Sequence, residues 1–187
     1  MPLLPLQILW INLVTDGPPA LALSAEPAGR DIMRRPPHPP DEGVLARGLG
    51  RHVVWVGALM ALVSLATGLW YSQTAPEIWQ TMVFTTLTLS QLGHVMAIRS
   101  GDESLFRGGL LSNKPLLGAV ALTFVLQLLP IYTPFFQRFL EAEALSLADL
   151  AIAVALGSII FWEVEFEKWL VRRNSSERGH SAEDSLQ

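Results

Sequence analysis

The residues best suited to chemistry in this sequence are three polar side chains near its beginning, Asn12, Thr15 and Asp16. Positions i, i+3 and i+4 of an α-helix share one face, so the three side chains would point to one place. A carboxylate inside an apolar segment costs about 3 kcal/mol and is normally paired with a cation, a proton or a polar group. Amide, hydroxyl and carboxylate oxygens suit a hard cation such as Ca²⁺ or Mn²⁺ better than zinc or copper.

Directly after this group the sequence reads Gly17-Pro18-Pro19, which predicts a break in the helix. The two prolines have no amide hydrogen, so the carbonyls of Val14 and Thr15 lose their usual helical donors and become candidate ligands. A glycine beside Asp16 would also allow the backbone to unwind. Broken helices of this kind form ion sites in membrane transporters.

A structural role is the alternative for the same three residues. Asn12 and Thr15 would then only bond a neighbouring helix, while Asp16 would be protonated or would cap the second half of the broken helix. Each polar residue taken alone admits this interpretation. Their combination with the tandem prolines favours an ion site.

The elements that must position this group are membrane-spanning helices. Half of the 187 residues are hydrophobic and only 16% are charged, and the charges fall between long apolar stretches. A hydrocarbon core about 30 Å thick requires about 20 apolar residues per helix. The predicted fold class is therefore all-α, a polytopic membrane helical bundle of about five transmembrane helices, which cover about residues 3–25, 53–71, 78–98, 115–136 and 147–169.

The connections between these spans predict the orientation of the chain. Twelve of the 13 Lys and Arg residues fall in the segments 26–51 and 99–114 and after residue 167. Because basic residues are enriched on the cytoplasmic side, the amino terminus is predicted to start outside and residues 174–187 to form a disordered cytoplasmic tail. The chain has no cysteine, which excludes disulfides and thiolate metal sites.

Other polar residues carry weaker signals. His38 and His94 have no second histidine or carboxylate at ligand spacing in the sequence, so we interpret them as structural. Glu163, Glu165 and Glu167 are spaced by two and do not all share a helical face, which favours a solvated helix end over a metal site. No phosphate-binding loop or catalytic triad is present, and no catalytic residue is predicted.

The segment Pro5-Leu6-Gln7-Ile8-Leu9-Trp10-Ile11-Asn12-Leu13-Val14-Thr15-Asp16-Gly17 resembles the sixth transmembrane helix of P-type cation-transporting ATPases, especially calcium pumps of type II. The stretch Asp31-Ile32-Met33-Arg34-Arg35-Pro36-Pro37 resembles the cytoplasmic loop that follows it in the family, and the later spans fit helices seven to ten. The resemblance covers about residues 1–173 and implies the C-terminal membrane domain of such a pump.

The resemblance also implies roles for individual residues. It makes Asn12, Thr15 and Asp16 direct ligands of the transported cation, which is calcium in the pumps of this type. It places Gln91 at the position of a further family ligand, a glutamate on the eighth helix. A neutral amide supplies an oxygen without a charge, so this departure favours one cation per cycle over two.

The resemblance further implies partners that the printed sequence does not contain. It has no Asp-Lys-Thr-Gly-Thr phosphorylation motif and no nucleotide-binding domain, so ATP and magnesium would act only through the rest of a pump, its catalytic domains and first five helices. Arg34 and Arg35 are predicted to dock on those domains or only to anchor the topology. We expect a multi-pass protein in the lipid bilayer of a bacterial plasma membrane, without a nucleic-acid partner. The alternative is a free-standing small membrane protein with a structural or regulatory role.

Overall fold

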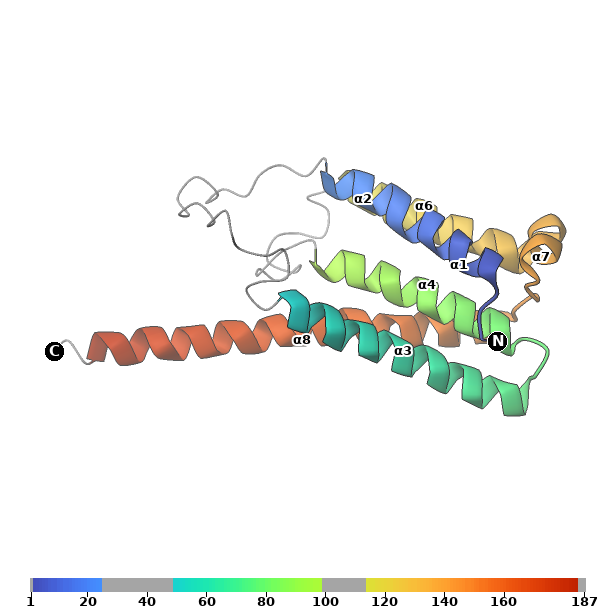
Figure 1. The fold of residues 1–187 in the computed structure, drawn as a ribbon. Coiled ribbons are helices and arrows are strands. Elements are labelled where there is room, and N and C mark those ends of the chain that lie inside the picture. Colours follow the sequence, from blue (N-terminus) through green and yellow to red (C-terminus); the bar gives the residue numbers. More distant parts are fainter. Residues whose placement is uncertain (1, 25–48, 99–113, 185–187) are drawn as a thin grey trace.

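A computed structural model describes residues 2–24, 49–98 and 114–184 as a bundle of helices (Figure 1), with no strand among them. The fold class is therefore all-α, as predicted. The first segment is divided into three short pieces, and four later helices are long and apolar enough to cross a membrane. The elements are α1 (Pro5–Ile11), the π-helical η1 (Asn12–Asp16), α2 (Gly17–Ser24), α3 (Leu49–Thr74), α4 (Trp79–Ile98), α6 (Lys114–Tyr132), α7 (Pro134–Leu140) and α8 (Leu147–Asp184).

The ends of the bundle differ in what they carry. Figure 1 places the amino terminus, the turn between α3 and α4 and the short helix α7 at one end, whereas the carboxy-terminal end of α8 projects from the other. The first segment together with α3, α4, α6 and α8 runs along the length of the bundle. The amino terminus and the carboxy-terminal end of α8 thus lie at opposite ends of the bundle, and their placement on opposite sides of a membrane stays a prediction.

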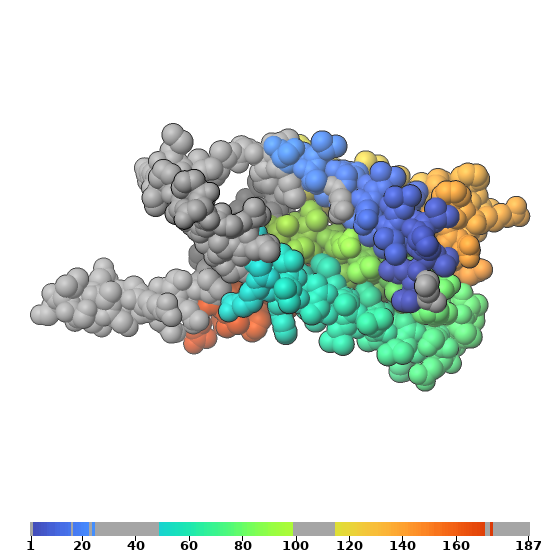
Figure 2. Space-filling view, in the orientation of Figure 1, coloured from blue at the N-terminus to red at the C-terminus, as the bar shows by residue number. Residues whose placement is uncertain are grey.

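Helix α4 is the centre of the bundle. Inside the described part of the chain, 61% of its span is buried, against 22–28% of the spans in α3, α6 and α8. In the space-filling view, α4 shows between the first segment and α3 (Figure 2). Small hydroxyl residues let helices approach closely in membranes. The buried face of α4 is rich in them, namely Thr81, Thr85, Thr86, Thr88 and Ser90.

The most extensive helix contact is between α4 and α8, and it depends on a glycine. A Cβ atom added at Gly157 of α8 would lie 2.7 Å from the Cβ of Leu89 and 3.0 Å from its carbonyl carbon. Real Cβ atoms do not approach this closely, so only glycine fits at this point of the interface. The absence of a side chain on α8 thus fixes how near it lies to the central helix.

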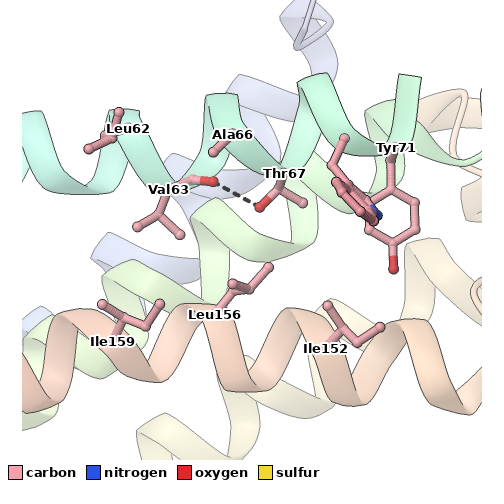
Figure 3. Close-up of a pocket in the computed structure, with 9 residues that line it drawn as sticks. Leu62, Val63, Ala66, Thr67, Tyr71, Ile152, Leu156 and Ile159 are labelled. Atoms are coloured by element: carbon pink, nitrogen blue, oxygen red, sulfur yellow. Dashed lines mark hydrogen bonds between the residues drawn. The ribbon is translucent and has the colours of Figure 1, made fainter. Parts of the chain in front are cut away.

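A groove separates α3 from α8 toward the end of the bundle that holds the turn between α3 and α4. It holds about 430 Å³ and is lined almost entirely by apolar side chains (Figure 3), including Leu62, Leu156 and Ile159. Both hydroxyls drawn in it have partners: Thr67 donates to the carbonyl of Val63 in its own helix at 2.8 Å, and Tyr71 donates to Oδ1 of Asp149 at 2.8 Å. The groove therefore offers hydrocarbon rather than polar contacts to its surroundings.

Two segments differ from the expected spans. Helix α6 ends at Tyr132, and the separate helix α7 begins at Pro134, because a proline without an amide hydrogen fits the first turn of a new helix better than the interior of an old one. The backbone of α8 is helical as far as Asp184, where the sequence predicted a disordered tail from residue 174. That stretch has no proline, and its Glu, Arg and Ala residues favour a helix.

Two glutamates of α8, Glu163 and Glu167, bind side chains of the neighbouring helix α3. Glu163 accepts a hydrogen bond from the indole Nε1 of Trp55 at 2.6 Å, and Glu167 lies 2.9 Å from Nδ1 of His52. His94 is not isolated either, because its ring stacks on that of His52 at 5.5 Å between centroids. The expected solvated helix end was wrong for Glu163 and Glu167 because their partners lie on α3, far from α8 along the chain, whereas the stacking of His94 agrees with the structural role expected for it. Arg34 and Arg35 lie outside the described residues.

Candidate functional site

The predicted ion-ligand group coincides with a local change of helix type. Residues Asn12 to Asp16 form the π-helix η1, with α-helix on both sides. Short π-helical stretches are rare and occur frequently at functional sites, because the wider turn moves side chains and carbonyls out of their α-helical positions. The irregularity thus falls on the candidate ligands themselves.

The two prolines do not end the helix: they lie in the first turn of α2, which continues directly from η1. Their effect is on the residues before them. Gly17 has φ −62°, an ordinary right-handed value, and an added Cβ would meet nothing within 4 Å among the described residues. The backbone at Gly17 is therefore one that any residue could adopt. The irregularity that was expected at residues 17–19 lies instead in the preceding turn, at Asn12–Asp16.

The carbonyl of Val14 is the backbone group that the prolines leave without a donor. Its α-helical donor would be the amide of Pro18 and its π-helical donor the amide of Pro19, and neither has a hydrogen. The hydroxyl of Thr123 on α6 donates to this oxygen at 3.0 Å, and the Thr123 side chain is fully buried. A buried side chain on another helix thus satisfies the carbonyl that the sequence offered as a ligand, and one lone pair of that oxygen remains.

Thr15 and Gln91 are brought together across the interface of the first segment with α4. The Thr15 hydroxyl, which is 3% exposed, lies 2.7 Å from Oε1 of Gln91 and 2.8 Å from the carbonyl oxygen of Ile11. A hydroxyl has one hydrogen and can donate to only one of these oxygens at a time. Three oxygen atoms, from Thr15, Gln91 and Ile11, thus lie together at this interface.

The other two predicted ligands stand differently. The Asn12 side chain is exposed and makes no hydrogen bond with any described residue. Asp16 ends η1, and only its backbone is described, so its role as a ligand stays a prediction. Of the four candidate residues, the structure joins Thr15 to Gln91 and leaves Asn12 on the surface of this chain.

The rest of the first segment is anchored at both ends. Gln7, which is fully buried, donates from Nε2 to the carbonyl of Leu140 at the end of α7 at 3.0 Å. At the other end, Ala22 packs in a cluster with Leu116 and Ala119 of α6. The π-helix is therefore held between two fixed points on α6 and α7.

Sequence reasoning missed Thr123. Its signal is visible in retrospect, because a threonine and a glutamine stand at positions 123 and 127 of an otherwise apolar span, on one helical face. Polar side chains in a membrane span face protein rather than lipid. This rule indicates a buried role for the pair but does not indicate which helix they would meet.

Comparisons with known proteins agree with this architecture. The family described as "Cation transporting ATPase, C-terminus" matches residues 1–170. A calcium-transporting ATPase of Bacillus subtilis is 39% identical over 162 residues, which are 85% of this chain and 18% of the relative. Calcium-transporting ATPase 1 of Yarrowia lipolytica is 33% identical over 94% of this chain and 19% of its own length. The human calcium-transporting ATPase type 2C member 1 is 31% identical over 98% of this chain and 20% of its own length.

The chain spans about a fifth of the length of these relatives, and in each comparison most of its own residues are aligned. Their names agree in describing calcium-transporting ATPases. Together with the apolar helices, the match identifies an integral, multi-pass membrane protein. The chain belongs to the family of C-terminal membrane domains of cation-transporting P-type ATPases, of the type II calcium-pump class.

Proposed function

We propose that this chain forms the part of an ATP-driven pump that binds the transported cation, with Asn12, Thr15, Asp16 and Gln91 as ligands. The cation is calcium, and the pump lies in the plasma membrane of a bacterium. Energy enters through the other parts of the pump, its catalytic domains and first five helices, which also bind ATP and magnesium. The choice of calcium and of a bacterial membrane rests on the names of the relatives, including the bacterial one at 39% identity.

The contact between Thr15 and Gln91 is the observation that supports this proposal most directly. It joins a residue of the π-helix to the central helix α4 through oxygens alone, at 2.7 Å. Oxygen ligands from two helices, with a backbone carbonyl nearby, are the set that Ca²⁺ prefers. Only the Asp16 carboxylate would bring a full negative charge, because Gln91 is neutral, which supports one ion per cycle.

The exposed position of Asn12 fits the same proposal. A bare amide on a membrane helix is unfavourable against lipid, so it is expected to meet a further polar group. We propose that this group comes from the part of the pump that lies outside the matched segment. The ion would then bind between this chain and those helices, with the Thr15–Gln91 pair forming its inner wall.

A chimaera tests the proposal. Residues 1–173 would replace the matched segment of the Bacillus subtilis calcium-transporting ATPase, and ATP-dependent Ca²⁺ uptake would be measured in inverted membrane vesicles, with Mn²⁺ as competitor. We expect uptake and cation-dependent phosphorylation of the chimaera. A chimaera with both Thr15→Val and Gln91→Leu should insert equally well and bind calcium more weakly.

Insertion must be checked separately from transport. Membrane yield and protease resistance show whether the chimaera folds. A folded chimaera that neither Ca²⁺ nor Mn²⁺ causes to be phosphorylated would contradict the proposal and would favour a structural or regulatory membrane protein instead.

A further inference from the structure

Two more polar groups are buried about one turn from the hydrogen bond between Val14 and Thr123, toward the end of the bundle that holds the amino terminus. They are the indole Nε1 of Trp10 on α1 and the side-chain amide of Gln127 on α6, which is 1% exposed. Neither the indole nitrogen nor either amide atom has a hydrogen-bond partner among the described residues, so the two groups do not bond each other directly. A buried amide or indole without a partner destabilises a fold by about 1–3 kcal/mol.

The register of the two helices places these groups at the same level. The first segment and α6 run antiparallel, with Ala22 against Leu116 and Val14 bonded to Thr123. Trp10 lies four residues before Val14, and Gln127 lies four residues after Thr123. Four residues are about one turn of α6, and the four residues from Trp10 to Val14, which cross into the π-helix, are slightly less than one turn. Both groups therefore lie on the same side of the Val14–Thr123 bond along the two helices.

Further protein helices cannot supply the missing partner. Asn12 is exposed and can meet another part of a pump, but the polar atoms of Trp10 and Gln127 are already covered by this chain. The partner must therefore be small enough to lie inside the bundle. It must also accept hydrogen bonds from the indole N–H of Trp10 and from the amide nitrogen of Gln127, and donate one to the amide oxygen of Gln127.

We infer that a single bound water molecule bridges Trp10 and Gln127. Its oxygen accepts from the indole Nε1–H and from the amide Nε2, and it donates to Oε1, which gives the three hydrogen bonds typical of a buried water. The site joins α1 to α6 just outside the π-helix. Together with Thr123 it ties α6 to the first segment at two successive turns, and it does so whichever cation the pump carries.

Radiolytic labelling of the full chain in lipid nanodiscs tests the site. A short X-ray pulse converts bound water into hydroxyl radicals, and oxidation of Trp10 is then read by mass spectrometry in ¹⁸O-labelled water. We expect Trp10 to be oxidised in the wild type and several-fold less in Gln127→Leu, which removes two of the three hydrogen bonds. Gln137→Leu is the matched control, because the Gln137 amide donates to the carbonyl of Ile131 at 2.7 Å and has no part in the site.

A thermal double-mutant cycle gives a second readout, with Gln127→Met replacing Gln127→Leu if the leucine variant folds poorly. Trp10→Phe and Gln127→Leu each leave a buried group with fewer partners, whereas the double variant leaves none. The two shifts in melting temperature should therefore sum to more than the shift of the double variant. Unchanged oxidation of Trp10 in both Gln127 variants, or strictly additive shifts, would overturn the inference.

Discussion

At Thr15 one hydroxyl hydrogen is shared between two acceptor oxygens, from Ile11 and Gln91. The hydroxyl can donate to only one of these oxygens at a time, so the second oxygen stays close without that hydrogen bond. Under the proposed function a cation would bind these oxygens, and the carboxylate of Asp16 would supply the charge that this neutral group lacks. The three oxygens are thus described at this interface, whereas the negative charge of the proposed ion site would come from Asp16, whose role as a ligand is still a prediction.

The charge of Asp16 can be tested separately from its shape. Asp16→Asn keeps size and hydrogen-bonding capacity and removes the negative charge. In the chimaera with the Bacillus subtilis pump we expect it to abolish Ca²⁺-dependent phosphorylation from ATP. Thr15→Ala, which loses about 1 kcal/mol of interaction, should weaken calcium affinity only about fivefold.

The control for this prediction is phosphorylation from inorganic phosphate, which should persist in Asp16→Asn if the protein is folded. Normal calcium affinity in Asp16→Asn would show that the carboxylate is not a ligand. It would leave the capping role as the explanation for an acidic residue beside the prolines.

Thr123 carries a second prediction at the scale of single residues. Thr123→Val keeps the shape of the side chain but removes the only side-chain donor described for the Val14 carbonyl. A buried carbonyl left without a donor should lower the free energy of unfolding by about 1–3 kcal/mol. Thr123→Ser keeps the hydroxyl and should recover most of the loss, measured by thermal unfolding in detergent. Equal losses in both variants would mean that packing of the methyl group, not the hydrogen bond, matters at this position.

The sequence alone predicted a residue of the candidate site only where its position relative to other residues of the same helix indicated it. Thr15 was found from its position next to the prolines, and the resemblance to calcium pumps brought in Gln91. Thr123 was missed because hydropathy marks a polar residue in a span without naming the helix that it meets. The same limit explains His94, whose neighbour His52 is on another helix.

At the scale of elements, the positions of α4 and η1 were the least predictable. A hydropathy pattern gives the length of a span but not its place in the bundle, so the hydroxyl residues of α4 could have faced a channel or other helices equally well. At the end of the π-helix, the Val14 carbonyl lacks both possible backbone donors, because neither Pro18 nor Pro19 has an amide hydrogen. The spacing rules for α-helices do not describe this condition.

The contact of α4 with α8 gives a prediction for a whole interface. Gly157→Ala would place a methyl group 2.7 Å from the Cβ of Leu89, where backbone atoms also crowd it, so the helices must separate. Overpacking of this kind should destabilise the bundle by about 1–3 kcal/mol, measured by thermal unfolding.

Gly57→Ala on α3 is the matched control for Gly157→Ala. An added Cβ at Gly57 meets nothing within 4 Å among the described residues, so this variant should be neutral or slightly stabilising because alanine favours helix. If both alanine variants unfold at the same temperature as the wild type, the α4–α8 interface is looser than the structure shows.

At the scale of the whole molecule, charge and architecture separate the two ends of the bundle. The end with the amino terminus and α7 carries Arg138 as the one basic residue of its connections, while α8 bears Lys168 near the opposite end, where it also bonds the carbonyl of Ala97. Charged and aromatic side chains of α3 and α8 thus meet at the end that the positive-inside rule assigns to the cytoplasm. The bundle is polarised along the same axis on which a pumped ion would move.

Single-cysteine labelling tests this polarity directly, because the chain has no cysteine of its own. Ser112→Cys lies in the segment 99–113, which is outside the described residues, and Ala144→Cys lies in the exposed connection between α7 and α8. Twelve of 13 basic residues predict that Ser112 is cytoplasmic and Ala144 external. In intact cells, a membrane-impermeant maleimide should therefore label Ala144→Cys at once and Ser112→Cys only after the membrane is permeabilised. Labelling of Ser112→Cys from outside, with Ala144→Cys protected, would invert the topology and place the segment 26–51 on the side away from the proposed ATP-hydrolysing domains.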